Sequence, residues 1–316
     1  MTRCVSFVTT LYNKAVFLPF VLAGLKAQTG PFEREFVFVD DGSTDNTVAL
    51  LKELTEDWTD PVTIVEQENQ GPSMASNNGF AVATGDLIKP VDGDDMLNPW
   101  CTAALLEAME QFGTEIAHGL VSPETFDPTG KEPAEAFLER QVDPGGAPIL
   151  YKNALVRSLQ RSRTNPTSWL ATADLVKRSG GCDPDIFIQD YSIELRLMHL
   201  AGKAAFTSRN IFVPPKEAPE RLSGNEAQIL HDLNMALASF LDENPLPLTQ
   251  KFLAYRRALR RCWAWARRQK GQKTPFSKVH RAYLRVYFPF GISPDHIRKE
   301  STVFQQGARL RIPGAR

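Results

Sequence analysis

The chain has 316 residues, 42% apolar and 23% charged, so it can bury a sizeable core as one large domain or two. Its 36 Lys and Arg balance 37 Asp and Glu, but no acidic residue lies between Glu243 and Asp295, which makes the carboxy-terminal part basic. Four scattered cysteines without a CxxC pair argue against a zinc site and a disulfide scaffold. The sequence shows no signal-peptide pattern and no apolar run near the roughly 18 residues of a membrane span, so we expect a cytoplasmic protein.

Short apolar runs alternate with helical patterns through the first 121 residues. Strands are predicted at residues 5–9, 36–39, 62–65, 87–91 and 116–121, and helices at residues 15–27, 47–54, 69–83 and 99–112. This alternation predicts an α/β fold with a mostly parallel sheet and helices on both faces. Ligands bind such sheets outside the carboxyl ends of the strands.

Polar residues gather at three of these strand ends. Thr10 and Tyr12 follow the first strand, Asp41 follows the second, and an acidic cluster follows the fourth. We therefore expect one ligand site at this edge of the sheet. Neither GxGxxG nor GxxxxGK[ST] occurs, which argues against a dinucleotide-binding enzyme and a P-loop protein.

The acidic cluster consists of Asp92, Asp94 and Asp95, with Gly93 between the first two. If the strand continued through it, Asp92 and Asp94 would point to one side and Asp95 to the other. Carboxylates this close repel one another unless a cation relieves them, and Mg²⁺ or Mn²⁺ prefers such oxygen ligands. A solvated acidic turn is the simpler alternative.

Five motifs, in order, resemble glycosyltransferase family 2. They are Thr9-Thr10-Leu11-Tyr12-Asn13, Val39-Asp40-Asp41-Gly42-Ser43-Thr44-Asp45, Asn69-Gln70-Gly71-Pro72, Asp92-Gly93-Asp94-Asp95, and the segment from Gly180 to Leu197 that holds Gln189-Asp190. The resemblance implies the GT-A fold, a Rossmann-like nucleotide-diphospho-sugar transferase, over residues 1–225. We expect residues 1–121 to form its donor half, 122–225 its acceptor and base half, and 226–316 a helical basic extension.

The resemblance also implies roles for single residues. The residues implied to bind the nucleotide are Thr10, Tyr12, Asp41, Asp92 and Asp94. Asp94 and Asp95 are implied to hold a divalent cation, Mn²⁺ or Mg²⁺, as in the DXD motif of the family. A tyrosine offers a stacking face for a base, and an aspartate accepts hydrogen bonds from imide or hydroxyl groups.

Asp190 is implied to be the general base that takes the proton of an acceptor hydroxyl. A helix cap is the alternative for Asp190, because residues 191–201 have helical periodicity. Two departures from the family concern its surroundings: Gln189 stands in place of Glu, and Ser76 stands in place of an Arg near the diphosphate. Lys89 or a later residue is a candidate to replace that missing cation.

The middle of the chain is rich in Pro and Gly over residues 122–168, so we expect little regular structure there and part of the acceptor site. Trp169 is either a sugar-stacking platform or a core tryptophan. Residues 211–213 read as an edge strand, followed by a loop in which Arg221 could contact the diphosphate.

Basic and aromatic residues alternate over residues 251–290, as in an amphipathic basic helix or helix pair. Such a helix can dock on an anionic membrane surface. It can equally be a helical appendage whose basic face is solvated. Nucleic acid is not an expected partner.

Together these features predict a metal-dependent inverting glycosyltransferase of hexosyltransferase type. It would move a sugar from a nucleotide donor, expected to be a UDP-sugar, to a glycan or lipid-linked acceptor in polysaccharide biosynthesis, at the inner face of the membrane. One alternative is a catalytically silent GT-A module for partner or membrane binding. The other, a nucleotidyltransferase that forms sugar nucleotides, should carry a glycine- and lysine-rich loop after the first strand, which is absent.

Overall fold

The computed structural model describes residues 2–161, 165–216, 225–269, 278–285, 293–305 and 310–311. They fall into two compact units, which we call the sheet unit and the helical unit. The sheet unit comprises Met1–Ala154, Thr164–Cys182 and Leu197–Ala218, and the helical unit comprises Leu155–Arg163, Asp183–Arg196 and Pro219–Arg316. Two internal segments therefore pack with the carboxy-terminal helices, whereas the expected division at residue 225 stays a prediction about domains.

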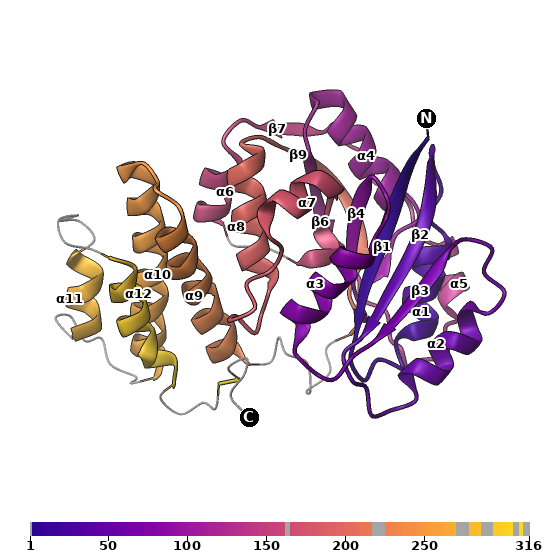
Figure 1. Cartoon of the computed structure of the whole chain (residues 1–316), viewed down its shortest axis with the longest axis horizontal. Helices are drawn as coiled ribbons and strands as arrows, with labels where there is room; N and C mark the ends of the chain where they lie inside the picture. The colour runs from indigo at the N-terminus through magenta and orange to yellow at the C-terminus, as the bar shows by residue number, and fades with distance from the viewer. Residues whose placement is uncertain are drawn as a thin grey trace. The chain divides into compact units, whose positions relative to one another are not determined.

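All strands belong to the sheet unit. They are β1 (Arg3–Leu11), β2 (Phe32–Asp40), β3 (Val62–Glu66), β4 (Leu87–Asp92), β5 (Met96–Leu97), β6 (Ile116–Val121), β7 (Ile149–Tyr151), β8 (Trp169–Thr172) and β9 (Ala204–Val213). The sheet order is β3-β2-β1-β4-β8-β6-β9-β5, with β7 paired to β9 (Figure 1). The pairs β1–β2, β1–β4, β2–β3 and β6–β9 are parallel.

Helices alternate with the strands up to β9, and the described elements after β9 are helices. The helices up to residue 201 are α1 (Leu18–Lys26), α2 (Thr47–Thr55), α3 (Pro72–Val82), α4 (Cys101–Phe112), α5 (Ala134–Glu139), α6 (Ala154–Gln160), η1 (Pro166–Ser168), α7 (Ala173–Ser179) and α8 (Asp190–Ala201). The later ones are α9 (Glu226–Glu243), α10 (Leu248–Gln269), α11 (Lys278–Arg285), α12 (Pro294–Ser301) and η3 (Thr302–Gln305).

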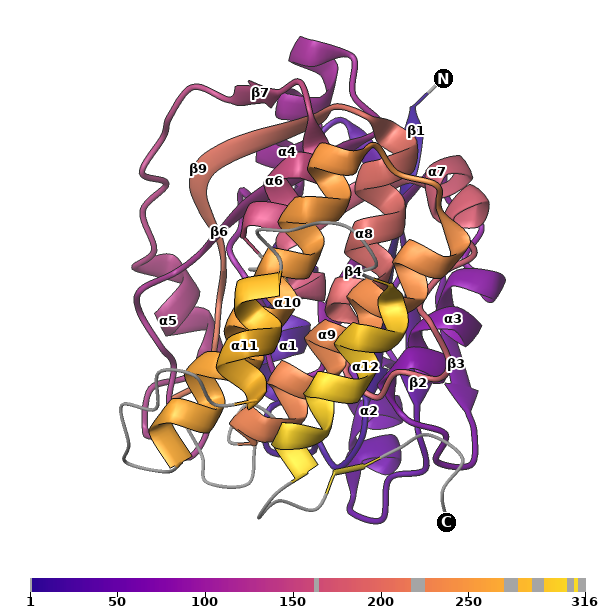
Figure 2. The ribbon, with the colours of Figure 1, turned by 90° about the vertical axis from the view of Figure 1, so that its left-hand side faces the viewer.

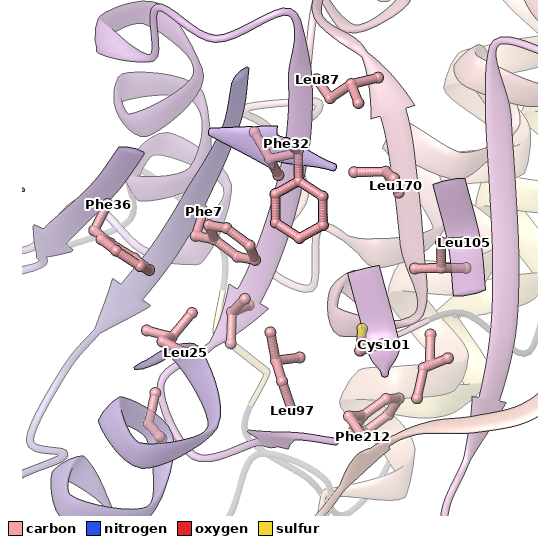
Figure 3. Packing of buried hydrophobic residues seen from close by; sticks show 14 of the residues in the cluster. Phe7, Leu25, Phe32, Phe36, Leu87, Leu97, Cys101, Leu105, Leu170 and Phe212 are labelled. Atoms are coloured by element: carbon pink, nitrogen blue, oxygen red, sulfur yellow. The ribbon is translucent and has the colours of Figure 1, made fainter. Parts of the chain in front are cut away.

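The core of the sheet unit forms because strands β1, β2, β4 and β8 turn large apolar side chains toward α1, α2 and α4. Phe7 and Phe36 stack there with ring centroids 5.3 Å apart, and Leu170 and Phe212 join the same cluster (Figure 3). On the other face α3 approaches closely, since a Cβ on Gly79 would lie 2.4 Å from a Val8 methyl. The sheet is thus covered by helices on both faces at β1 and β2.

In the helical unit α9, α10 and α12 lie side by side (Figure 2). Their apolar stripes share one core with α8, built from residues such as Tyr191, Leu195, Leu237, Leu259 and Ile297. α9 and α10 give this part of the chain the helical character that the sequence predicts. None of the helices that the structure describes is long and apolar enough to cross a membrane.

The order of strands and helices predicted for the first 121 residues is confirmed. Two predictions further along are wrong. Residues 122–168 hold more regular structure than expected, namely α5, β7, α6 and η1. Residues 211–213 are not an edge strand but the end of β9, which pairs with β6 and also with β5 and β7. The prolines that follow end the strand without placing it at an edge.

Candidate active site

The loops after β1 and β2 are joined through Asn13. Its Oδ1 accepts hydrogen bonds from the backbone N–H groups of Thr44 at 2.7 Å and Asp45 at 3.3 Å, and its own N–H donates to Ser43 Oγ at 2.8 Å. Asn13 adopts a positive φ of 53°, which Asn tolerates better than most residues. This linkage leaves the neighbouring Tyr12 44% exposed at the edge of the sheet.

Asp41 ties the glycine turn to the same edge. Its Oδ1 accepts hydrogen bonds from Gln67 Nε2 and the Gln70 N–H, both at 2.8 Å, and its Oδ2 accepts from the Gly71 N–H at 2.9 Å. The side chain is only 4% exposed. Asp41 therefore supports the turn in this structure, and its direct contact with a nucleotide stays a prediction.

Asp40, beside Asp41, has an unused acceptor. Its Oδ2 accepts from the Ser43 N–H at 2.9 Å, but its buried Oδ1 has no hydrogen-bond partner among the residues that the structure describes. A buried polar atom without a partner costs free energy, which a ligand N–H could recover. Thr10 is also near this edge, half-buried on β1 with Asp92 opposite it on β4.

The acidic cluster forms a turn at the end of β4. The strand ends at Asp92, and the Asp95 N–H donates to the Asp92 carbonyl at 2.9 Å, so strand alternation does not extend to the last two acids. Gly93 is packed against β1, where a Cβ would lie 2.5 Å from a carbonyl oxygen. Asp94 forms an ion pair with Lys14, whose Nζ lies 2.6 Å from Oδ2.

Asp95 is turned toward a different group of residues. Its Oδ2 accepts hydrogen bonds from Thr167 Oγ1 at 2.7 Å and Asn165 Nδ2 at 3.2 Å. The same Thr167 hydroxyl accepts from the Asp92 N–H at 3.0 Å. Burial, followed by the charges of Asp92 and Asp94, raises the pKa of Asp95 well above its usual range. Asp95 thus holds its proton more tightly than an exposed aspartate. Its hydrogen bonds to Thr167 and Asn165 connect the acidic turn to η1.

Lys89 cannot replace the missing arginine in this structure, which corrects the role considered for it. Its side chain is fully buried, and its Nζ donates to the carbonyls of Pro90 at 2.9 Å and Thr167 at 2.6 Å. Burial lowers the pKa of Lys89. Among the described residues, Lys14 is the cation that forms an ion pair with the acidic turn.

The acidic turn also bears on metal binding. Within the described parts of the chain, no group of three or more His, Cys, Asp or Glu could hold a metal ion by itself. Mg²⁺ commonly takes one or two carboxylates from the protein and completes its coordination with substrate phosphates and water. Asp94 and the half-buried Asp92 fit that requirement in chemistry, whereas Asp95 is 1% exposed and already bonded to Thr167 and Asn165.

Asp190 belongs to the helical unit, where it is the first residue of α8. It is half-buried, and the preceding Gln189 is 5% exposed, with its carbonyl accepting from the Ser192 N–H at 3.0 Å. An acid in the first turn of a helix is favoured by the helix dipole. One turn later lies Glu194, which is buried and accepts a hydrogen bond from Ser158. Burial raises the pKa of Glu194 to about 8.

The segment that leads toward Asp190 is also fixed to α3. Asn77 donates from Nδ2 to the Cys182 carbonyl at 2.9 Å and accepts from the Cys182 N–H at 2.7 Å. Gly181 has a φ of 77° and could not carry a side chain, because a Cβ would lie 2.3 Å from Asn77 Oδ1. Ser76, which replaces the arginine of the family, is buried.

One expected contributor, Trp169, is not open to the site, and another, Arg221, cannot be placed. Trp169 is 2% exposed at the start of β8, near Phe80 with ring centroids 6.4 Å apart, so it has no open face for a sugar and matches the alternative of a core tryptophan. We do not propose it as an acceptor residue. Arg221 lies outside the residues that the structure describes.

Sequence reasoning missed several residues of the site. Lys14 directly follows the first motif and Asp40 lies inside the second, so a closer look at both motifs could have found them. Asn165 and Thr167 stand in the Pro- and Gly-rich segment, far along the chain from the acids they contact. No local pattern in the sequence points to those two.

Residues 6–167, about half of the chain, match the family described as glycosyl transferase family 2. The chain belongs to this family. An uncharacterized glycosyltransferase of Nostoc sp. is 36% identical over 106 residues, which are 34% of this chain and 33% of that protein. The undecaprenyl-phosphate 4-deoxy-4-formamido-L-arabinose transferase of Pseudomonas fluorescens is 35% identical over 100 residues, which are 31% of this chain and 29% of that protein. The matched part thus spans about a third of these relatives.

Solved structures of other proteins resemble this chain over most of its length. TarS of Staphylococcus aureus in complex with UDP-GlcNAc gives a TM-score of 0.63 at 16% identity, covering 97% of this chain and 93% of that chain. The mannosyltransferase PcManGT of Pyrobaculum calidifontis, in complex with GDP-Man and Mn²⁺, gives 0.63 at 17% identity, covering 95% and 84%. The predicted GT-A fold with a helical carboxy-terminal region is therefore confirmed.

Proposed function

We propose that this glycosyltransferase is metal-dependent and inverting, and that it moves a sugar from a nucleotide-diphosphate donor to a hydroxyl of a glycan or lipid-linked acceptor. The observation that carries the proposal is the joining of four sequence motifs at one sheet edge. Asn13 connects the first motif to the second, Asp41 connects the second to the third, and Lys14 connects the first to the acidic turn. Such an edge is where open α/β sheets bind their ligands.

The nucleoside would bind against Tyr12 and Thr10. The exposed ring of Tyr12 offers a stacking face, and the buried Oδ1 of Asp40 can accept a hydrogen bond from the imide of a uracil-type base. Asp41 would act through the Gly71 turn that it holds. A UDP-sugar is our first choice of donor, and the neighbours in complex with UDP-GlcNAc and GDP-Man name the two nucleotides to compare.

Asp94 and Asp92 would hold Mn²⁺ or Mg²⁺ together with the diphosphate. When bound, the cation neutralises the charge that grows on the departing nucleotide. Asp95 would keep the turn in shape, through Thr167 and Asn165, and we no longer prefer it as a direct ligand. Lys14 would compensate the negative charge of Asp94 while no cation is bound.

Asp190 would be the general base of the transfer. Its carboxylate takes the proton of the acceptor hydroxyl while that oxygen attacks the anomeric carbon from the side opposite the leaving nucleotide. One in-line displacement inverts the anomeric centre. The named activity of the Pseudomonas relative, a transferase acting with undecaprenyl phosphate, supports a lipid-linked acceptor as the first class to test.

The test is the release of nucleoside diphosphate from a panel of UDP-, GDP- and TDP-sugars, with Mn²⁺, with Mg²⁺ or with a chelator. We expect one donor to be consumed only in the presence of the divalent cation, and faster when lipid-linked sugar is added. No release from any donor under any condition would contradict the proposal.

A second proposal concerns α10, which has an exposed basic face. Arg256, Arg260 and Arg267 are exposed and share one face with Trp263, because their spacing of four, seven and eleven residues returns to the same side of a helix. Trp263 stacks on Tyr283 of α11 at 5.2 Å between ring centroids. We propose that this face binds the anionic inner surface of a membrane, where each basic residue contributes about 1 kcal/mol.

Vesicle sedimentation would test this membrane contact. The wild type should bind vesicles with anionic phosphatidylglycerol, weakly at high salt, and not vesicles of phosphatidylcholine alone. Arg256→Glu/Arg260→Glu/Arg267→Glu should lose the binding. The control Lys26→Glu/Lys131→Glu/Lys152→Glu changes the net charge equally in the sheet unit, and an equal loss there would contradict a specific surface on α10.

A further inference from the structure

The segment that ends at Asp190 is held by side chains of α9. The Ile188 N–H donates to Asp232 Oδ2 at 3.0 Å, two residues before Asp190. Earlier in the segment, Asp183 Oδ2 accepts a hydrogen bond from Ser239 Oγ at 2.6 Å. We call residues 183–190 the base segment. These contacts lie within the helical unit, so α9 is bonded directly to the base segment.

The contacts follow one face of α9. Asp232, Ser239 and Glu243 are spaced by seven and four residues, which places them on the same side of a helix. Glu243 contacts α8 beyond Asp190, because its Oε1 lies 3.1 Å from Nη2 of Arg196. The same helix packs Leu237 against the core that holds Tyr191 and Leu195. Both sides of Asp190 are therefore anchored to α9.

Asp232 is the most strongly bonded member of this face. It is 3% exposed, and besides Ile188 it accepts a hydrogen bond from Gln228 Nε2 at 2.9 Å and contacts His231 Nδ1 at 2.7 Å. The tautomer of His231 that carries its proton on Nδ1 donates to this carboxylate. Gln228 is itself fixed, because its Oε1 accepts from the Arg311 N–H at 2.6 Å. A buried charge with this many donors cannot shift without leaving them unsatisfied.

We propose that Asp232 is a positioning residue for the general base: it fixes the Ile188 backbone and thereby aims Asp190 at the acceptor hydroxyl. This inference rests on the proposed role of Asp190. The physical reason is that Ile188 is followed directly by Gln189 and the start of α8, so the Ile188 N–H bond sets the direction in which the helix begins. Misplacement of a catalytic group by about 1 Å can cost about 10²-fold in rate.

The experiment compares Asp232→Ala, Asp232→Asn and Asp242→Ala in the full chain. Asp242 is the matched control, since it lies on the same helix but pairs with Arg298, away from the base segment. Four quantities are measured: kcat and KM for sugar transfer, the Kd of the nucleoside diphosphate, and the hydrogen-exchange rate of the Ile188 amide.

Asp232→Ala should lower kcat by about 10²-fold, leave KM for the donor and the Kd of the nucleotide unchanged, and speed exchange at Ile188. Asp232→Asn retains an acceptor oxygen and should restore most of kcat and the slow exchange, which separates positioning from a loss of folding. Asp242→Ala should leave all four quantities unchanged.

The inference is overturned if exchange at Ile188 speeds up while kcat stays within about twofold of the wild type, or if neither changes. It is also overturned if Asp232→Asn loses as much rate as Asp232→Ala. These outcomes leave the proposed function standing, because the wild type still transfers sugar. A wild type that neither binds nucleotide nor transfers sugar removes both proposals at once.

Discussion

Two buried carboxylates, Asp94 in the sheet unit and Glu194 in the helical unit, have different surroundings. In the sheet unit, Asp94 has Lys14 as an ionic partner, and Asp95 has two side-chain donors. In the helical unit, Glu194 has only the hydroxyl of Ser158, and its Oε2 has no hydrogen-bond partner among the described residues. Asp94 is thus the anion of an ion pair, whereas burial favours the protonated form of Glu194.

This difference matters for Asp190, which lies one helical turn before Glu194. Two like charges four residues apart on a helix repel each other. Since burial raises the pKa of Glu194 to about 8, Glu194 is largely protonated near neutral pH and does not oppose the charge of Asp190. Asp94 thus has the positive charge of Lys14 beside it, whereas Asp190 has a protonated Glu194 one turn away. The predictions below test this contrast.

The largest effect is expected from Asp190→Asn. The amide cannot accept the proton of the acceptor hydroxyl, so kcat should fall by about 10²–10⁴-fold while the Kd of the nucleoside diphosphate stays unchanged. Steady-state kinetics and calorimetric titration measure the two quantities. The control is Asp185→Asn, an exposed acid in the same segment, which should retain full kcat. Equal kcat values for both variants would exclude Asp190 as the base.

Glu194→Gln should remove a pH dependence of stability. Below pH 4.5 Glu194 is protonated in both the folded and the unfolded chain; between pH 4.5 and about 8 the unfolded chain ionises first, so the free energy of unfolding falls as the pH rises. Above about pH 8 it falls no further. Urea titrations at pH 5 and pH 8 should therefore show Glu194→Gln to be more stable than the wild type at pH 8 and nearly equal at pH 5. Asp295→Asn, at an exposed acid of the helical unit, should not reproduce this difference.

A smaller effect is expected from Thr167→Val in the sheet unit. Valine has nearly the same shape but leaves the buried Asp95 carboxyl and the Asp92 N–H without the hydroxyl, which should cost about 1–3 kcal/mol in the free energy of unfolding. The Kd of the nucleotide in the presence of Mn²⁺ should rise as the acidic turn loosens. Thr167→Ser retains the hydroxyl and should behave as the wild type, and a Ser variant as weak as Val would contradict a role for the hydroxyl.

The sequence predicted the donor half better than the rest because its elements alternate and its polar motifs follow strand ends. Residues 116–121 form β6 as expected, and the motifs at Asn13 and Gly71 are connected by the hydrogen bonds of one sheet edge. Local patterns are sufficient there, since parallel strands bring their carboxyl ends together.

The residues that the sequence did not predict belong to long-range contacts, which no local sequence pattern indicates. Thr167 reaches Asp95 across 72 positions of the chain, and Asp232 reaches Ile188 across 44. The sequence leaves open whether Trp169 stacks on a sugar or lies in the core, because composition cannot show which side of β8 faces the core. Lys89 looked available as a cation because its burial follows from packing and not from its neighbours in sequence.

The central claim is that the motifs at the sheet edge form a metal-dependent nucleotide site, and calorimetric titration of UDP with and without Mn²⁺ tests it most directly. The wild type should bind UDP more tightly with Mn²⁺, and Asp94→Ala should lose that gain. Asp86→Ala, which removes an acid at the other end of β4, should retain it. If neither UDP nor GDP binds with Mn²⁺, or if Asp94→Ala binds UDP as the wild type does, the account of this site is wrong.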